Sequence, residues 1–137
     1  MPHPTLYEFS LANAFLYGEN NPDLENTSGA RLDQLVRAEK QIFYYTYDMG
    51  DYWEHEVLVE RILKPKKGAK YPVCLKGNRA CPPEDSGGPP GYAHMLRVIR
   101  NKRHPEYREM MEWLGEGFDP TAFDLKAINR GLRRLSK

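Results

Sequence analysis

The chain has 137 residues, 40% of them hydrophobic and 12% aromatic, a composition that is typical of a globular protein and not of a disordered one. Its formal net charge is only +1, and no apolar run approaches the ~20 residues that a membrane helix needs. The first residues show no basic segment followed by an apolar one, as a secretory signal would. We therefore expect residues 1–137 to form one domain, located in the cytoplasm and not in a membrane.

The first part of the chain predicts short strands. Residues 6–11, LYEFSL, alternate and are rich in aromatic side chains, and residues 14–18, AFLYG, predict a second short strand. Residues 20–30 have the composition of a polar loop, and residues 31–39 predict a short helix.

A hairpin is the clearest prediction in the sequence. Residues 41–47 are β-branched and aromatic, residues 53–63 alternate, and the sequence DMGDY between them is typical of a turn. The alternation places Trp53, His55, Val57, Val59 and Leu63 on one face of the second strand. We expect that face to be buried.

After about residue 92 the hydrophobic period changes to that of helices. A first helix is followed by a second that starts at Pro105 and ends at Gly115. Asp119 followed by Pro120 predicts the N-cap of a last helix. The predicted inward positions are Tyr92, Met95, Leu96 and Ile99, then Tyr107, Met110, Met111 and Leu114, then Leu125, Ile128, Leu132 and Leu135. This order of elements indicates the α+β class, a mostly antiparallel sheet with C-terminal helices packed on one face.

Three segments carry a resemblance to a known family. They read YTYDMGDYWEHEVLVERIL, then YPVCLKGNRACPPEDSGGPPGY, then HPEYREMMEWLGEGFDPTAFDLKAINRGL. Together they resemble the plasmid pRiA4b open-reading-frame-three-like family, which is also met as a passenger protein of insertion elements. The resemblance runs from about Leu6 to Leu135. It implies an association with mobile elements but no established activity.

The chain departs from the family pattern at its start. Members of the family usually carry an upstream strand with an Ile-Trp-Arg run and then a helix, before the segment that resembles LYEFSL. Either the gene start is short or this member folds with fewer elements. The first strand would then lack a neighbour and leave an open sheet edge.

Residues 74–92, CLKGNRACPPEDSGGPPGY, predict neither helix nor strand, because they are rich in proline and glycine. One interpretation is a binding loop that presents Glu84 and Asp85, with Trp53 and Tyr92 as further ligand-binding candidates. The other is a rigid lid over an open end of the core. The glycines match no phosphate-binding fingerprint, since they follow no strand and open no helix of the required pattern.

The cysteines raise the question of a metal. Cys74 and Cys81 are separated by six residues, which is not the spacing of a zinc knuckle. His55 and His94 are further candidate ligands, and a zinc site would need two such groups to meet the cysteines in space. We expect reduced cysteines, no metal and no cofactor, with zinc as the alternative.

His55 lies on the apolar face of its predicted strand. A core histidine bonded to Asp48 or Asp51 accounts for that position. The alternative is a general base oriented by one of these carboxylates, but the sequence offers no serine in an elbow motif as nucleophile.

Basic residues recur along the last predicted helix. Lys126, Arg130, Arg133 and Arg134 fall on one helix face, and a second cluster from Arg97 to Arg103 could join them. Such a stripe is an electrostatic footprint for nucleic acid. The alternative is that cations stabilise the C-terminal end of a helix through its dipole.

These observations lead to an ordered set of hypotheses. The first is a small interaction module that binds a protein partner and is not an enzyme. The second is a metal- or histidine-dependent hydrolytic enzyme that uses Asp48, Asp51, His55 and the loop with Glu84 and Asp85. The third is an accessory protein for nucleic acid that acts through the last helix.

Overall fold

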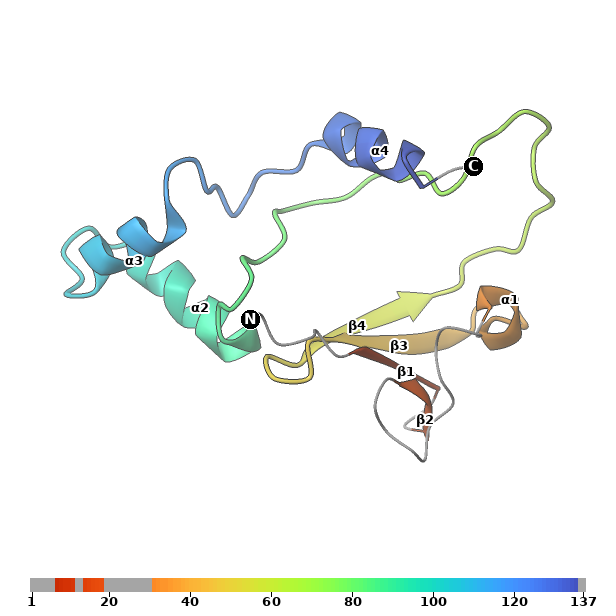
Figure 1. Ribbon diagram of the computed structural model, residues 1–137, viewed down its shortest axis with the longest axis horizontal. Coiled ribbons are helices and arrows are strands. Elements are labelled where there is room, and N and C mark those ends of the chain that lie inside the picture. The colour runs from red at the N-terminus through yellow and green to blue at the C-terminus, as the bar shows by residue number, and fades with distance from the viewer. Residues whose placement is uncertain (1–6, 12–13, 19–30, 136–137) are drawn as a thin grey trace. The chain divides into compact units, whose positions relative to one another are not determined.

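The computed structural model describes residues 7–11, 14–18 and 31–135; the predicted loop at 20–30 lies outside them. The elements are β1 (Tyr7–Leu11), β2 (Ala14–Gly18), α1 (Leu32–Leu35), β3 (Ile42–Tyr47), β4 (Trp53–Leu58), α2 (Gly88–Ile99), α3 (Tyr107–Leu114) and α4 (Leu125–Arg133) (Figure 1). The α+β class is confirmed. The chain divides into a sheet unit, Met1–Leu63 with Gly87–Pro90, and a helical unit, Lys64–Ser86 with Gly91–Lys137.

The sheet unit contains a four-stranded sheet in the order β2-β1-β3-β4, and each neighbouring pair is antiparallel. β1 pairs with β2 from Glu8 opposite Gly18, and with β3 from Tyr7 opposite Tyr47. The two predicted N-terminal strands are therefore confirmed. The expectation that the first strand lacks a neighbour is wrong, because β1 lies between two strands.

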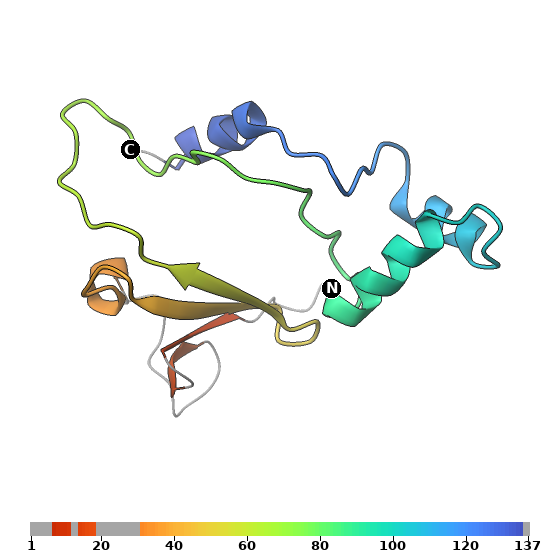
Figure 2. The same ribbon diagram turned by 180° about the vertical axis from the view of Figure 1, so that it is seen from behind.

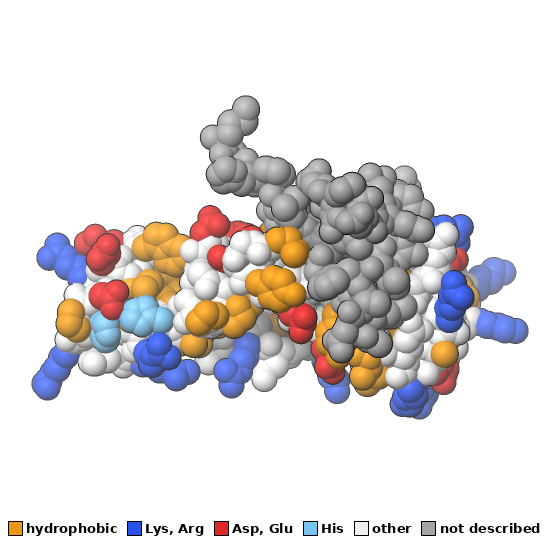
Figure 3. Space-filling view, turned by 90° about the horizontal axis from the view of Figure 1, so that it is seen from below, with side chains coloured by type: hydrophobic (Ala, Val, Ile, Leu, Met, Phe, Trp, Pro, Cys, Tyr) orange, Lys and Arg blue, Asp and Glu red, His pale blue; other side chains and the backbone are white. Residues whose placement is uncertain are grey.

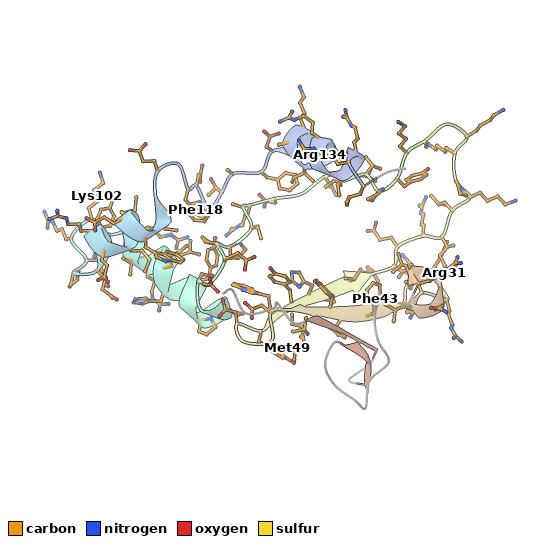
Figure 4. The ribbon with its side chains drawn as sticks, viewed as in Figure 1. Arg31, Phe43, Met49, Lys102, Phe118 and Arg134 are labelled. Carbon is orange, nitrogen blue, oxygen red and sulfur yellow. The ribbon has the colours of Figure 1, made fainter. Side chains whose placement is uncertain are left out.

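β3 and β4 form the predicted central hairpin, with Met49 in the turn (Figure 4). Asp48 shapes this turn. Its Oδ1 accepts hydrogen bonds from the backbone N–H of Gly50 at 3.0 Å and of Asp51 at 3.3 Å. A short carboxylate side chain thus satisfies the main chain of its own turn, as aspartate commonly does.

β4 is shorter than the predicted strand at 53–63. Val59 N still donates to Gln41 O at 2.9 Å. Further along, Ile62 N donates to the side-chain Oε1 of Glu39 at 3.0 Å and no longer to a strand backbone. The paired register ends at Ile42 opposite Leu58, and Lys40, just before β3, has a φ of 67°, which is outside the β region.

The predicted buried face of β4 is only partly correct. Trp53, Val57 and Val59 are half-buried, but His55 is exposed and Leu63 is 75% exposed. β4 is an edge strand of the described sheet, so its side chains have strand neighbours on one side only. The buried side chains described in this unit are Leu35, Phe43 and Thr46.

α2 begins inside the proline- and glycine-rich stretch. The prediction that residues 74–92 contain no helix is wrong, because Gly88, Pro89 and Pro90 form the first turn of α2. Prolines are tolerated there, since the first N–H groups of a helix have no partner within it. The glycines therefore do open a helix, although their pattern matches no phosphate-binding motif.

α3 agrees closely with its prediction, whereas the cap of α4 does not. Asp119 accepts hydrogen bonds from Thr121 Oγ1 at 2.7 Å and Thr121 N at 2.9 Å, and these bonds lower the pKa of the Asp119 carboxyl below its usual value. Asp119 therefore closes a turn. The N-cap of α4 is Asp124, whose Oδ1 accepts from Ala127 N at 2.9 Å.

The most deeply buried described side chains belong to α2. Met95 is 1% exposed and Val98 is 0% exposed, and only the first of these is a predicted inward position. α3 and α4 have no buried residue. The predicted inward face of α4 is wrong at Ile128 and Leu135, which are 37% and 68% exposed. Periodicity identifies the apolar side of a helix but not how deeply it is buried.

Replacement of Met95 tests this description of the core. We expect Met95→Ala to lower the free energy of unfolding by about 2–5 kcal/mol, because a fully buried side chain leaves a cavity. Met111→Ala is the matched control, since Met111 is 38% exposed. Urea unfolding would measure both, and equal losses in the two variants would contradict the assignment of Met95 to the core.

Candidate functional site

The hairpin turn contacts the two glycines that precede and begin α2. Gly87 N donates to Asp51 Oδ2 at 3.2 Å. A Cβ atom on Gly88 would collide with the backbone oxygen of Asp51, and Gly88 has a φ of 69°. Only glycine combines that conformation with so close an approach. Asp51, a candidate catalytic residue in the sequence, therefore has a structural role in this contact.

His55 is not the core histidine that the sequence predicts. It is exposed, its Nδ1 lies 3.0 Å from Tyr45 O across the hairpin, and the two ring centroids are 5.4 Å apart. The hydrogen bonds described for Asp48 and Asp51 go to backbone N–H groups and not to His55. The general-base hypothesis for His55 remains a prediction without a supporting contact.

A groove of about 340 Å³ lies between α2 and α3 in the helical unit. Its acidic residues are Asp85, Glu106 and Glu109, its apolar residues are Met95, Met110 and Trp113, and Ser86, Gly91 and His94 complete it. Figure 3 shows histidine side chains next to acidic and hydrophobic ones, at the left of the view. The volume is at the lower end of the range for ligand pockets, so the groove fits a small group.

Hydrogen bonds around Glu106 fix one wall of the groove. His94 Nε2 donates to Glu106 Oε2 at 3.1 Å, and Glu106 N donates to His104 Nδ1 at 3.1 Å. The two imidazole rings meet edge to face with centroids 6.0 Å apart. No hydrogen bond or ion pair from the described residues holds the carboxylates of Asp85 or Glu109. These two groups are therefore available to a ligand.

Ser86 adds an unsatisfied polar group to the groove. Its Oγ is buried and has no hydrogen-bond partner among the described residues. Gly91 permits the backbone of Ser86 to lie close to α2, since a Cβ atom on Gly91 would collide with the backbone oxygen of Ser86. A buried hydroxyl without a partner costs about 1–3 kcal/mol. A ligand that bonds to it would remove that penalty.

The sequence-based candidates are only partly represented in the groove. Asp85 lines it, and so does His94, which the sequence suggested only as a metal ligand. Trp53, Glu84 and Tyr92 are engaged in other interactions within the chain. The acidic and apolar positions on or just before α3 were missed: Glu106, Glu109, Met110 and Trp113. Their i, i+3, i+4, i+7 spacing is visible in the sequence, but the facing wall from α2 is not.

The proline-rich stretch is attached to α4 by two hydrogen bonds between the backbone of Cys74 and the side chain of Asn129. Cys74 N donates to Asn129 Oδ1 at 2.8 Å, and Asn129 Nδ2 donates to Cys74 O at 2.9 Å. The extended chain runs beside α4 there (Figure 2). A Cβ atom on Gly77 would collide with the ring of Phe123. These contacts describe a fixed structural segment and not a free loop.

The candidate metal ligands are not gathered into one place. Cys74 and Cys81 are free thiols, and Cys74 Sγ donates weakly to Lys76 O at 3.5 Å. In the ranges that the structure describes, no three His, Cys, Asp or Glu residues form a group that could hold a metal ion. The candidates Cys74, Cys81, His55 and His94 therefore form no such group.

The basic residues of α4 and its C-cap are exposed: Lys126, Arg130, Arg133 and Arg134. Figure 4 labels Arg134 at α4 and Lys102 in the loop after α2, well apart within the helical unit. Lys102 therefore does not extend the stripe. A role of the stripe in nucleic-acid binding remains a prediction.

None of the described helices has the length and apolar character to cross a membrane. The chain is thus a small α+β protein with an acidic groove beside its helices. A family model described as Plasmid pRiA4b ORF-3-like protein matches residues 3–127. The chain belongs to this family, as its three motifs predict.

Two relatives are similar to this chain over most of its length. The uncharacterized protein y4hQ of Sinorhizobium fredii (strain NBRC 101917 / NGR234) is 34% identical over 139 residues, which cover 96% of this chain and 70% of that protein. The crystal structure of MM3350, a protein of unknown function from Methanosarcina mazei Go1, matches with a TM-score of 0.80 at 39% identity. That match covers 90% of this chain and 72% of MM3350. Neither name states an activity.

The paired hydrogen bonds of Asn129 can be tested directly. We expect Asn129→Ala to lower the free energy of unfolding by about 1–3 kcal/mol, since the backbone N–H and C=O of Cys74 both lose their side-chain partner. Hydrogen exchange at the Cys74 amide should accelerate in the same variant. Lys126→Ala, on an exposed position of the same helix, is the control. Unchanged exchange at Cys74 would contradict the contact.

Proposed function

We propose that this chain is a non-enzymatic interaction module whose groove between α2 and α3 receives a basic side chain, arginine or lysine, of a partner protein. The observation that carries the proposal is the pairing of free carboxylates with an apolar wall. Asp85 and Glu109 have no described partner, and Met95, Met110 and Trp113 lie in the same groove.

The chemistry of the groove matches a long basic side chain. Such a side chain buries an apolar stem and keeps a cationic head. Trp113 is 52% exposed, so its ring face can attract a cation. The Ser86 hydroxyl can accept a hydrogen bond from the same head group. An anionic ligand such as a phosphate would instead be repelled by the acidic residues.

The hydrolytic alternative has less support in this groove. A serine nucleophile must lie within hydrogen-bond reach of its base. The Ser86 hydroxyl has no hydrogen-bond partner among the described residues, so it is not bonded to His94. His94 is instead bonded to Glu106.

The proposed setting is a cytoplasm that also holds mobile elements. The plasmid in the family description supports the mobile-element association. Free thiols at Cys74 and Cys81 are what a reducing compartment maintains.

Two small probes separate charge from shape. N-acetyl-arginine amide carries the cationic head, and N-acetyl-citrulline amide has nearly the same shape without the charge. We expect the arginine probe to shift the amide resonances of Ser86, Gly91 and Glu109 in an NMR titration of the labelled protein. The citrulline probe should bind about tenfold more weakly, because a charge-assisted hydrogen bond is roughly twice as strong as a neutral one.

Glu109→Gln should weaken binding of the arginine probe about three- to tenfold, since it removes one free carboxylate. Glu112→Gln is the matched control on α3, because Glu112 is paired with Arg108 and does not line the groove. Equal binding of the two probes, or no response to either at millimolar concentration, would refute the proposal.

A further inference from the structure

The sheet unit offers a second surface, at β4, that is independent of the groove. The strand order is β2-β1-β3-β4, so β4 pairs on one side only among the strands that the structure describes. An edge strand presents backbone N–H and C=O groups in a row that another extended chain can pair with.

The register identifies which backbone groups face outward. Val59 N donates to Gln41 O, so Val59 bonds toward the β3 side. Hydrogen-bonded residues alternate along an antiparallel pair, and the other odd-numbered residues of β4 therefore bond to β3 as well. The N–H and C=O groups of Glu54, Glu56 and Leu58 then point away from β3. They form the open side of the edge.

The side chains of these three residues give the edge its chemical character. All three are exposed, Leu58 by 48%, and they lie on one face of the strand. A residue directly opposite on an added antiparallel strand has its Cβ about 4.5–5.5 Å away, on the same face. The added strand would thus set its own alternate side chains against Glu54, Glu56 and Leu58.

The geometry points to this edge as a docking site for an extended segment of a partner protein, paired antiparallel to β4. The segment has lysine or arginine opposite Glu54 and Glu56, and an apolar residue opposite Leu58. Opposite charges on directly facing strand positions are favourable, and like charges there are unfavourable. The main-chain hydrogen bonds supply affinity, and the alternate side chains supply specificity.

A second copy of this chain does not fit the same edge. Antiparallel pairing of β4 with itself sets outward residues against one another in every register that overlaps them well. One register opposes Glu54 to Glu56, the next opposes Glu56 to itself, and the next opposes Glu54 to Glu60, which is also exposed. Each places like charges face to face, so the glutamates disfavour self-association and favour a basic strand.

A designed heptapeptide tests the pairing. It has threonine at alternate positions, with valine, lysine and lysine between them, in the order that antiparallel pairing sets against Leu58, Glu56 and Glu54. Fluorescence anisotropy would measure its binding to the full chain. A matched peptide with glutamate in place of both lysines should bind at least tenfold more weakly. A peptide that is N-methylated at the central lysine should also bind at least tenfold more weakly, because the backbone N–H of that lysine must donate to β4.

Hydrogen exchange gives a readout at single residues. In the free protein the amides of Glu54, Glu56 and Leu58 should exchange fast, while those of His55 and Val57 are protected by β3. Saturating peptide should protect the first set. Fast exchange at Glu54 and Glu56 in the bound state would overturn the proposal, even if the peptide binds elsewhere.

Charge reversal adds a test of specificity. The double variant Glu54→Lys and Glu56→Lys should lose the lysine peptide and gain the glutamate peptide. Glu112→Lys with Glu116→Lys, which makes the same change in net charge on the helical unit, should keep the original preference. If the first variant fails to fold, the N-methylated peptide still decides the matter with the parent protein. Failure of the lysine peptide to bind, or dimerisation of the parent through β4 in sedimentation, would refute the proposal.

Discussion

The contact between Asp51 and the two glycines that precede and begin α2 is the constraint that holds the first turn of α2 against the hairpin turn within the sheet unit. Asp51 accepts the N–H of Gly87, and its backbone oxygen occupies the space that a side chain on Gly88 would need. Asp48 holds the turn that presents Asp51. The sequences DMGDYW and PPEDSGG thus both contribute to this contact, through Asp51 and through Gly87 and Gly88. In this contact both motifs have a role in backbone packing.

Polar groups that the fold leaves unsatisfied identify the surfaces open to partners. In the groove the group is the buried Ser86 hydroxyl, together with the carboxylates of Asp85 and Glu109. At β4 it is the outward main chain of an edge strand. Buried polar groups are nearly always hydrogen-bonded in native proteins, and an exception calls for an explanation. For the Ser86 hydroxyl in the groove, a bound ligand is the explanation that we propose.

The sequence was sufficient for elements whose cause is local. The β3–β4 hairpin follows from β-branched and aromatic residues around the turn sequence DMGDY, and the end of α3 follows from Gly115. It was insufficient where two local signals compete. Asp119 and Asp124 are both good caps, and only the bond from Ala127 to Asp124 shows which one begins α4. Pro89 and Pro90 suggested a loop although a first helical turn accepts them.

The burial of side chains and their meeting in one site were the least predictable properties, because both depend on neighbours that are distant in sequence. His55 has the correct alternation for a core position, but β4 is an edge strand and leaves His55 exposed. The same limit applies to the groove. The acidic face of α3 is visible as a spacing, yet Ser86 and His94 reach it from a segment that the sequence separates by a loop.

Side-chain length separates most of the carboxylates with an assigned role, although Glu39 accepts the backbone N–H of Ile62 and Asp85 is free to bind in the groove. Asp48, Asp51, Asp119 and Asp124 all accept hydrogen bonds from backbone N–H groups close to a turn or a helix start. An aspartate is short enough to reach its own or a neighbouring main chain, and it therefore serves the architecture. Glu54, Glu56 and Glu109 are longer, exposed and not committed to the backbone. Their charge can pair with a partner without loss of a turn or a cap, and for that reason we propose basic ligands at both surfaces although the whole chain is nearly neutral.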